Sequence, residues 1–419
     1  MRLLNVCKSY CRVQGSFVGV WLFLQFVYHK YLEICYGYYL KHTASVDKSV
    51  ILFYSKPDYA DNARIMAEYM IKNGYAKKYK IYFNVSDLAK YKDTVDGITF
   101  VSCLDKNGWY KLQKMYLMIT AGYIFETHGN LLSIRYKKPE QYRVRLWHGC
   151  GYKDRDSSDN VDVRKFDVAL VPGELFVKPK AYFWNVEEKY ILPIGYPRYN
   201  WLMSKDDSAR NLADSFRNNS NTKLIIWMPT FRNDKEGKLV DSSNITKFPL
   251  VASREQWIEL NRVCKEKNVV LLVKLHRLQP DYNIPFDDFS NIKKINNDTF
   301  EKVDVQMYKF LAFTDALISD YSSIAVDYLI IDRPIAFALQ DYEEYKRTRG
   351  FVFEEPRDYM PGHHLYCLND LIGFISDVSL GLDPYKNKRL EMRNVAISIS
   401  DDYCKDLLDY LDKVGMSRI

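Results

Sequence analysis

From Ser49 onward, short apolar runs alternate with amphipathic stretches of helical spacing. The run VILFYS (50–55) predicts a first buried strand, and the stretch NARIMAEYMIKNGY (62–75) predicts a helix that ends near Gly74. This alternation continues along the chain and predicts an α/β protein with parallel sheets covered by helices. Further strands are predicted at 80–85, 98–103, 142–149, 167–173, 190–198, 224–231, 269–276, 316–323 and 334–339, and further helices at 110–120, 253–268, 303–314, 323–331 and 401–414.

The chain is long enough for two hydrophobic cores, because 419 residues exceed the usual size of one. A polar stretch at 204–223 contains a predicted short helix and marks a domain boundary. Strands and helices then resume in the same order, which predicts two doubly wound, Rossmann-like domains facing each other across a cleft. The predicted division is an N-terminal segment at 1–45, a first domain at 46–205 and a second domain at 206–419 with a closing C-terminal helix.

The N-terminal segment contains an apolar run of 12 residues, Phe17 to Tyr28, followed by an aromatic stretch. A spanning helix needs about 20 apolar residues, so this run is short for one. We predict an amphipathic helix lying on the inner membrane face, with Trp21 at the interface. A buried helix of the first domain and a signal peptide without a cleavage site are the alternatives.

The composition narrows the choice of function. The formal charge of +7 is spread along the whole chain, which disfavours nucleic-acid binding and suits an anionic lipid or a phosphate-bearing substrate. No Cys or His spacing is typical of a zinc site, so neither a metal nor a cofactor is predicted. Motifs of phosphate-loop ATPases, dinucleotide oxidoreductases, metalloproteases and common esterases do not occur.

Ligands of open α/β sheets bind beyond the carboxyl ends of the strands. His148 lies at such an end, in RLWHGCGYK, where Gly149 allows the backbone to approach a ligand closely. An imidazole there can take a proton from an attacking hydroxyl, and a structural histidine is the alternative.

The strand VVLLVKLH ends in His276, and Lys274 shares its face of the strand. Together with Arg277 these side chains form a plausible phosphate clamp, against the alternative of ordinary surface charges. Ser322 and Ser323 stand where a strand gives way to a helix, so they suit either a pyrophosphate or a helix cap.

Taken in order, these segments resemble the CDP-glycerol glycerophosphotransferase family, which includes primases and polymerases of teichoic acid synthesis. The resemblance covers roughly residues 120 to 380. It rests on RLWHGCGYK, GYPRYNWL, MPTFRND, LVKLH, the stretch from LISDYSS to KRTRGF, and PGHH.

The resemblance implies a GT-B-like fold and transfer of glycerol phosphate or ribitol phosphate from a CDP-polyol to a cell-envelope acceptor, with release of CMP. It implies an acceptor-binding first domain, a donor-binding second domain and peripheral association with the cytoplasmic face of the membrane. His148 and His276 match the family's proposed catalytic histidines. The predicted substrate-binding residues are Gly149, Lys153, Thr230, Arg232, Lys274, Asp320, Ser322, Ser323 and Arg349.

Two departures from the family pattern lie near this site: Cys150 to Lys153 follow WHG, and Arg277 follows KLH. A nucleotide-sugar glycosyltransferase of the same fold is the alternative enzyme. A non-catalytic envelope-assembly protein that binds CDP-polyol is the alternative from another class.

Overall fold

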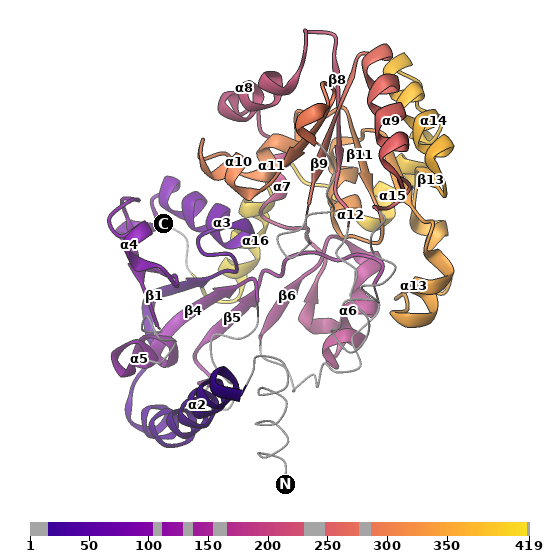
Figure 1. Cartoon of the computed structure of the whole chain (residues 1–419). Coiled ribbons are helices and arrows are strands. Elements are labelled where there is room, and N and C mark those ends of the chain that lie inside the picture. Colours follow the sequence, from indigo (N-terminus) through magenta and orange to yellow (C-terminus); the bar gives the residue numbers. More distant parts are fainter. Residues whose placement is uncertain are drawn as a thin grey trace. The chain divides into compact units, whose positions relative to one another are not determined.

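The protein is described from a computed structural model, which covers residues 16–103, 111–128, 137–153, 166–229, 248–275 and 286–416 (Figure 1). Two parallel sheets carry the fold, one of seven strands and one of six, as the alternation along the sequence predicts. The chain forms two compact units. The first comprises Met1–His148, Val163–Leu170 and Leu408–Ile419, and the second comprises Gly149–Asp162 and Val171–Leu407.

The first sheet has the strand order β3-β2-β1-β4-β5-β6-β7, and each of its strand pairs with a described register is parallel. Its strand β4 is buried at every residue and pairs with both β1 and β5. The strands are β1 (Asp47–Tyr54), β2 (Lys80–Asn84), β3 (Ile98–Val101), β4 (Ala121–Glu126), β5 (Tyr142–Arg145), β6 (Val168–Leu170) and β7 (Ile191–Leu192).

Strand β4 is the main element that the hydrophobic pattern did not predict. The preceding helix, α5, spans Leu112–Thr120, and its last residue is followed directly by Ala121 of the strand. No Gly, Pro or polar cluster separates the two elements, so the change of period from helix to strand leaves no signal in the sequence.

Helix α2 (Ser16–Thr43) is longer than its apolar run and packs one face into the first unit. Leu32 and Leu40 on that face join a core with Met115 and Met118 of α5 and Leu52 of β1. Within the described residues, no helix is both long and apolar enough to cross a membrane. The remaining helices of the first unit are α3 (Asp61–Lys72) and α4 (Leu88–Tyr91), and the C-terminal helix α16 (Tyr403–Lys413) contributes its last residues to the same unit.

The second sheet has the order β10-β9-β8-β11-β12-β13, again with parallel pairing. Strands β10 and β13 at its two edges were not predicted, because each has only three or four residues and little apolar character. The strands are β8 (Lys223–Trp227), β9 (Val269–Lys274), β10 (Ile292–Ile295), β11 (Ala316–Ser319), β12 (Ile335–Ala338) and β13 (His363–Leu365).

The helices of the second unit follow the same logic. The predicted capping box at the start of α9 forms only in part: Ser253 Oγ accepts from the Gln256 amide, but Gln256 Oε1 accepts from Ala252 instead of Ser253. The helices are α6 (Val177–Trp184), α7 (Tyr199–Leu202), α8 (Asp207–Phe216), α9 (Arg254–Glu266), α10 (Asn297–Glu301), α11 (Met307–Leu311), α12 (Ile324–Tyr328), α13 (Tyr342–Thr348), α14 (Leu368–Leu380) and α15 (Lys386–Ala396).

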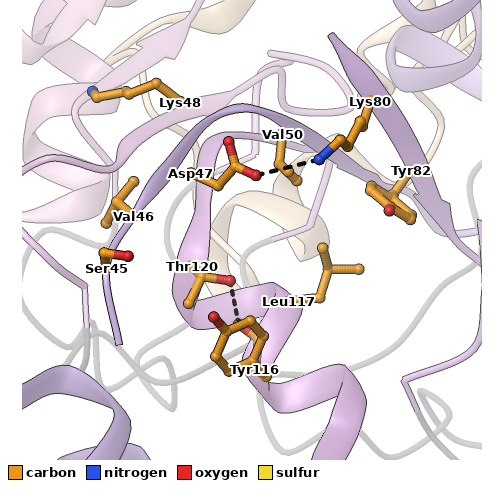
Figure 2. Close-up of a pocket in the computed structure, with 10 residues that line it drawn as sticks. All are labelled: Ser45, Val46, Asp47, Lys48, Val50, Lys80, Tyr82, Tyr116, Leu117 and Thr120. Carbon is orange, nitrogen blue, oxygen red and sulfur yellow. Dashed lines mark hydrogen bonds and ion pairs between the residues drawn. The ribbon is translucent and has the colours of Figure 1, made fainter. Parts of the chain in front are cut away.

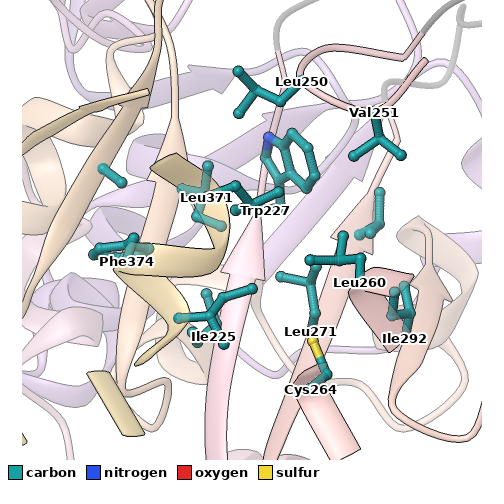
Figure 3. Close-up of a cluster of buried hydrophobic side chains, with 14 of the residues drawn as sticks. Ile225, Trp227, Leu250, Val251, Leu260, Cys264, Leu271, Ile292, Leu371 and Phe374 are labelled. Atoms are coloured by element: carbon teal, nitrogen blue, oxygen red, sulfur yellow. The ribbon is translucent and has the colours of Figure 1, made fainter. Parts of the chain in front are cut away.

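The core of the second unit lies between the sheet and helices α9 and α14 (Figure 3). Trp227, at the end of β8, is fully buried there, and its ring meets Phe248 edge-on with centroids 4.7 Å apart. Leu260 of α9 and Phe374 of α14 belong to the same cluster. This packing fixes the carboxyl ends of β8, β9 and β11, where the predicted ligand-binding residues follow.

Replacing Trp227 by Ala should lower the free energy of unfolding by about 3–5 kcal/mol, because a large buried side chain leaves a cavity. Urea unfolding followed by circular dichroism measures the change. The exposed Ile258 of α9 offers a control, since Ile258→Ala should stay within about 0.5 kcal/mol of the parent. Equal losses in the two variants would contradict the assignment of Trp227 to the core.

Candidate active site

The WHG segment begins just beyond β5, and its backbone adopts an unusual conformation. Trp147 has a positive φ of 56°, which is uncommon for a bulky residue. The side-chain amide of Asn62, from the start of α3, donates to the carbonyl oxygens of Leu146 at 3.3 Å and Trp147 at 2.9 Å. Asn62 therefore holds the strained turn that presents His148 at the carboxyl edge of the first sheet.

His148 is oriented by the residue that follows β4. Its Nδ1 lies 3.2 Å from the carbonyl oxygen of Thr127. A carbonyl oxygen only accepts hydrogen bonds, so the neutral imidazole carries its proton on Nδ1 and leaves a lone pair on Nε2. This is the tautomer that a general base needs.

A second histidine, His128, lies directly on His148. The two rings are parallel within 4°, and their centroids are 4.2 Å apart. Sequence reasoning missed His128, although it follows strand β4 in a Thr-His-Gly sequence that parallels the Trp-His-Gly after β5. Because β4 itself was not predicted, that resemblance between two strand ends had no place in the predicted sheet.

In the second unit, the two glycines that follow His148 lie against Ser323. A Cβ on Gly149 would fall 2.4 Å from Ser323 Oγ, and a Cβ on Gly151 would fall 2.8 Å from the Ser323 backbone nitrogen. Gly149 also has a φ of +136°, which L side chains rarely adopt. The structure thus brings together Gly149 and Ser323, two predicted site residues that are 174 positions apart in the sequence.

Ser323 is the residue before α12, but its side chain does not cap that helix. Its φ and ψ of −61° and −21° are already helical, and its hydroxyl makes no capping hydrogen bond. Between the two roles that the sequence left open for this serine, the capping role is therefore not the one that its hydroxyl performs.

The segment containing Arg349 is fastened to the same region. Tyr321, just before the two serines, donates to Asp341 Oδ1 at 2.9 Å and packs its ring on Phe351. Lys153 forms an antiparallel bridge with Phe351, and Arg349 precedes that bridge by two residues. Tyr321 thus holds the Arg349 segment, and Lys153 and Arg349 belong to the same cluster of loops as Gly149 and Ser323.

Asp327 of α12 is the polar centre beneath these loops. It is fully buried and accepts hydrogen bonds from Arg198 Nη2 at 2.6 Å, Tyr199 at 2.7 Å and Tyr308 at 2.6 Å. Arg198 in turn lies against Gly149, with its Nη2 3.2 Å from where a Cβ would be. Sequence reasoning used Arg198 only as part of GYPRYNWL and did not single out Asp327, whose partners come from distant segments.

Two further predicted residues lie at the carboxyl edge of the second sheet. Asp320 follows β11 and is buried. Lys274 ends β9, and burial lowers the pKa of its ammonium group. Strand β8 separates these two strands in the sheet. Thr230, Arg232 and His276 lie outside the described residues.

A larger polar cavity, of about 640 Å³, lies at the other edge of the first sheet (Figure 2). Its lining includes Asp47 and Lys80, at the amino ends of β1 and β2, whose charged groups are 3.7 Å apart. Tyr116 and Thr120 of α5 complete one wall. Because parallel strands place their ligand sites at the carboxyl edge, this cavity is separate from the candidate active site.

No metal centre is assembled in the described part of the chain. Among residues 16–103, 111–128, 137–153, 166–229, 248–275 and 286–416, no three His, Cys, Asp or Glu side chains are grouped to hold an ion. The chemistry of the site is therefore considered through its imidazole, hydroxyl, amide and cationic groups.

Two parallel doubly wound sheets, with histidine and serine loops at their carboxyl edges, define a GT-B-like transferase architecture. The family model described as CDP-Glycerol:Poly(glycerophosphate) glycerophosphotransferase matches residues 37–405, and the chain belongs to this family.

Curated relatives point the same way. The chain is 24% identical over 332 residues to the teichoic acid ribitol-phosphate polymerase TarL of Staphylococcus aureus, covering 74% of this chain and 52% of TarL. It is 24% identical over 396 residues to a teichoic acid poly(glycerol phosphate) polymerase of Bacillus spizizenii, covering 89% and 91% of the two chains. The chain spans only about half the length of the first of these relatives.

Solved structures confirm the fold. The structure of the wall teichoic acid polymerase TagF matches with a TM-score of 0.68 and 19% identity, covering 94% of this chain and 97% of TagF. A putative UDP-N-acetylglucosamine 2-epimerase from Listeria monocytogenes matches with a TM-score of 0.51 and 10% identity over 88% and 97% of the two chains. The predicted GT-B-like class is therefore confirmed.

Asp327→Asn should lower the free energy of unfolding by about 3–5 kcal/mol, because it leaves the buried Arg198 without its counter-charge. Tyr308→Phe removes one of three donors and should cost about 1–3 kcal/mol. Urea unfolding measures both. Asp207→Asn on the exposed start of α8 is the matched control, and a loss in Asp327→Asn no larger than in this control would contradict the role of the buried cluster.

Proposed function

We propose that the protein transfers glycerol phosphate or ribitol phosphate from a CDP-polyol to a hydroxyl of a lipid-linked or polysaccharide cell-envelope acceptor, releasing CMP. The observation that carries this proposal is the geometry of the WHGCG segment. It presents His148 in the tautomer of a base, and its next residues, Gly149 and Gly151, lie against Ser323. Membership of the glycerophosphotransferase family supplies the class of donor.

The proposed reaction is a displacement at phosphorus. The acceptor hydroxyl gives its proton to His148 Nε2, and its oxygen attacks the β-phosphorus of the donor. The bond from that phosphorus to the oxygen bridging the two phosphates breaks, and CMP leaves with the electron pair. Catalysis of this kind needs a correctly placed base and compensation of the charge on the phosphates.

The charge on the donor would be met from the second unit. Ser322, Ser323 and the adjoining backbone amides suit the pyrophosphate, and Gly149 leaves room for it. Lys153, Lys274 and Arg349 are the cationic partners in the described residues, and Asp320 would orient a polar group of the donor. Arg232, Thr230 and His276 keep their predicted roles, and the two histidines can exchange the part of base.

The printed names of the relatives include both ribitol-phosphate and poly(glycerol phosphate) polymerases. Near the site, this chain has Cys150 after the WHG glycine, and the Cys150 thiol is buried 3.1 Å from the Tyr196 hydroxyl. Burial raises the pKa of that thiol, so it is not a reactive group of the site. Its effect on polyol preference would be through the shape of the loop.

The proposal is tested by measuring CMP release from CDP-glycerol, CDP-ribitol and common nucleotide sugars with a lipid-linked acceptor. One CDP-polyol should release CMP, and His148→Ala should lower the rate by about 100-fold or more. His42→Ala, which removes an exposed imidazole from α2, should leave the rate unchanged. Turnover of a nucleotide sugar, with none of either polyol, would replace the proposal with the glycosyltransferase alternative.

We also propose that α2 places the enzyme on the cytoplasmic face of an anionic membrane. Its outward face is apolar rather than charged: Val20, Leu24, Tyr31, Ile34 and Tyr38 are all at least 46% exposed and recur every three or four residues. Lys41 and His42 lie in the last turn of the same helix. An apolar and aromatic stripe with nearby cationic groups suits the interface of anionic lipids.

Flotation with vesicles of phosphatidylglycerol and phosphatidylcholine tests this membrane contact. Changing both Leu24 and Tyr31 to Ser should reduce the floated fraction several-fold, because the helix loses apolar area buried in the interface. The control is Ile258→Ser, which removes an equally exposed side chain from α9. Equal flotation of the parent and the double variant would show that α2 does not make this contact.

A further inference from the structure

The ring stack of His128 and His148 is built on one residue, Thr127. Its carbonyl oxygen lies 3.2 Å from His148 Nδ1, and its hydroxyl lies 2.9 Å from His128 Nδ1. The Thr127 amide in turn donates to the Tyr54 carbonyl at 3.1 Å, which ties it to the end of β1. Both imidazoles are therefore referenced to the same point of the sheet edge.

We infer that His128 is a positioning residue for His148, whose parallel ring fixes the plane of the proposed base and faces the imidazolium that forms when the base takes its proton. This inference rests on the proposed role of His148. His128 is not itself placed as the base, since a parallel stack at 4.2 Å separates the two rings face to face and leaves no hydrogen bond between them.

The stack works in this way only if His128 is uncharged. Burial lowers the pKa of His128, and the positive charges of Lys56 and Arg145 act in the same direction, against the smaller opposing effect of Asp61. A neutral aromatic face attracts a cation that forms above it, whereas a second imidazolium would repel it. The surroundings of His128 thus keep it in the form that helps His148 accept a proton.

The stack also restrains His148 on the side that Thr127 does not. The hydrogen bond to the Thr127 carbonyl fixes one ring nitrogen but allows the ring to rotate about that contact. The ring of Trp147 has its centroid 4.0 Å from that of His148, and His128 adds a second flat surface at 4.2 Å. Small displacements of a base cost a large part of the rate, so this restraint affects turnover more than binding.

The kinetic test compares His128→Ala and His128→Asn, which remove the ring, with His128→Phe, which keeps a neutral aromatic face. The first two should lower kcat of CMP release by about 10- to 100-fold, while KM for the CDP-polyol stays within about twofold. His128→Phe should recover kcat to within about threefold of the parent. A loss in His128→Phe as large as in His128→Ala, or a parental kcat in His128→Ala and His128→Asn, would overturn the inference.

A second readout does not depend on turnover. In protein labelled with ¹⁵N-histidine, the parent and His128→Phe should show His148 as the tautomer protonated on Nδ1. His128→Ala and His128→Asn should show a mixture of tautomers. If the parent releases no CMP from either polyol, the proposed function fails, and these spectra still decide the positioning role. Identical His148 spectra in all four proteins would reject it.

Discussion

The buried carboxylate of Asp327 is the interaction on which the second unit's part of the site depends. An unpaired charge in a protein interior is prohibitively costly, so Asp327 requires its three donors. Those donors come from two other segments, at Arg198–Tyr199 and at Tyr308, and the carboxylate therefore fixes both against α12. Because Arg198 also lies against Gly149, the same cluster sets the height of the glycine loop over Ser323.

Close approach of backbone to backbone is the second constraint. Gly149 and Gly151 lie where no Cβ fits, and each meets Ser323 from a different side. On the other side of His148, Asn62 stabilises the positive φ of Trp147. A short run of residues is thus held at both ends by groups that carry no chemistry of their own. Such support is what a base requires, since its reactivity depends on placement as much as on its pKa.

Much of the fold could be predicted from the chain alone, because a change between helical and strand periodicity is a local property. The long apolar strands β1, β8, β9 and β11 showed this clearly, and so did His148 and Ser323 at strand ends. Strand β4 did not, since it continues directly from α5, and His128 was lost with it. Asp327 was missed for a different reason: an aspartate inside an apolar helical stretch gains its meaning only from partners over 100 positions away.

The amino-acid pattern by itself determined the α/β class, the two parallel sheets and the family, because periodicity and short motifs are written along the chain. Tertiary structure decided which loops meet: that the WHG glycines lie on Ser323, that Lys153 pairs with the Arg349 segment, and that His128 stacks on His148. The physical reason is that a motif specifies the chemistry of a side chain, whereas its partners are chosen by strand order and packing. Strand order depends on contacts between segments far apart in sequence, which no local pattern records.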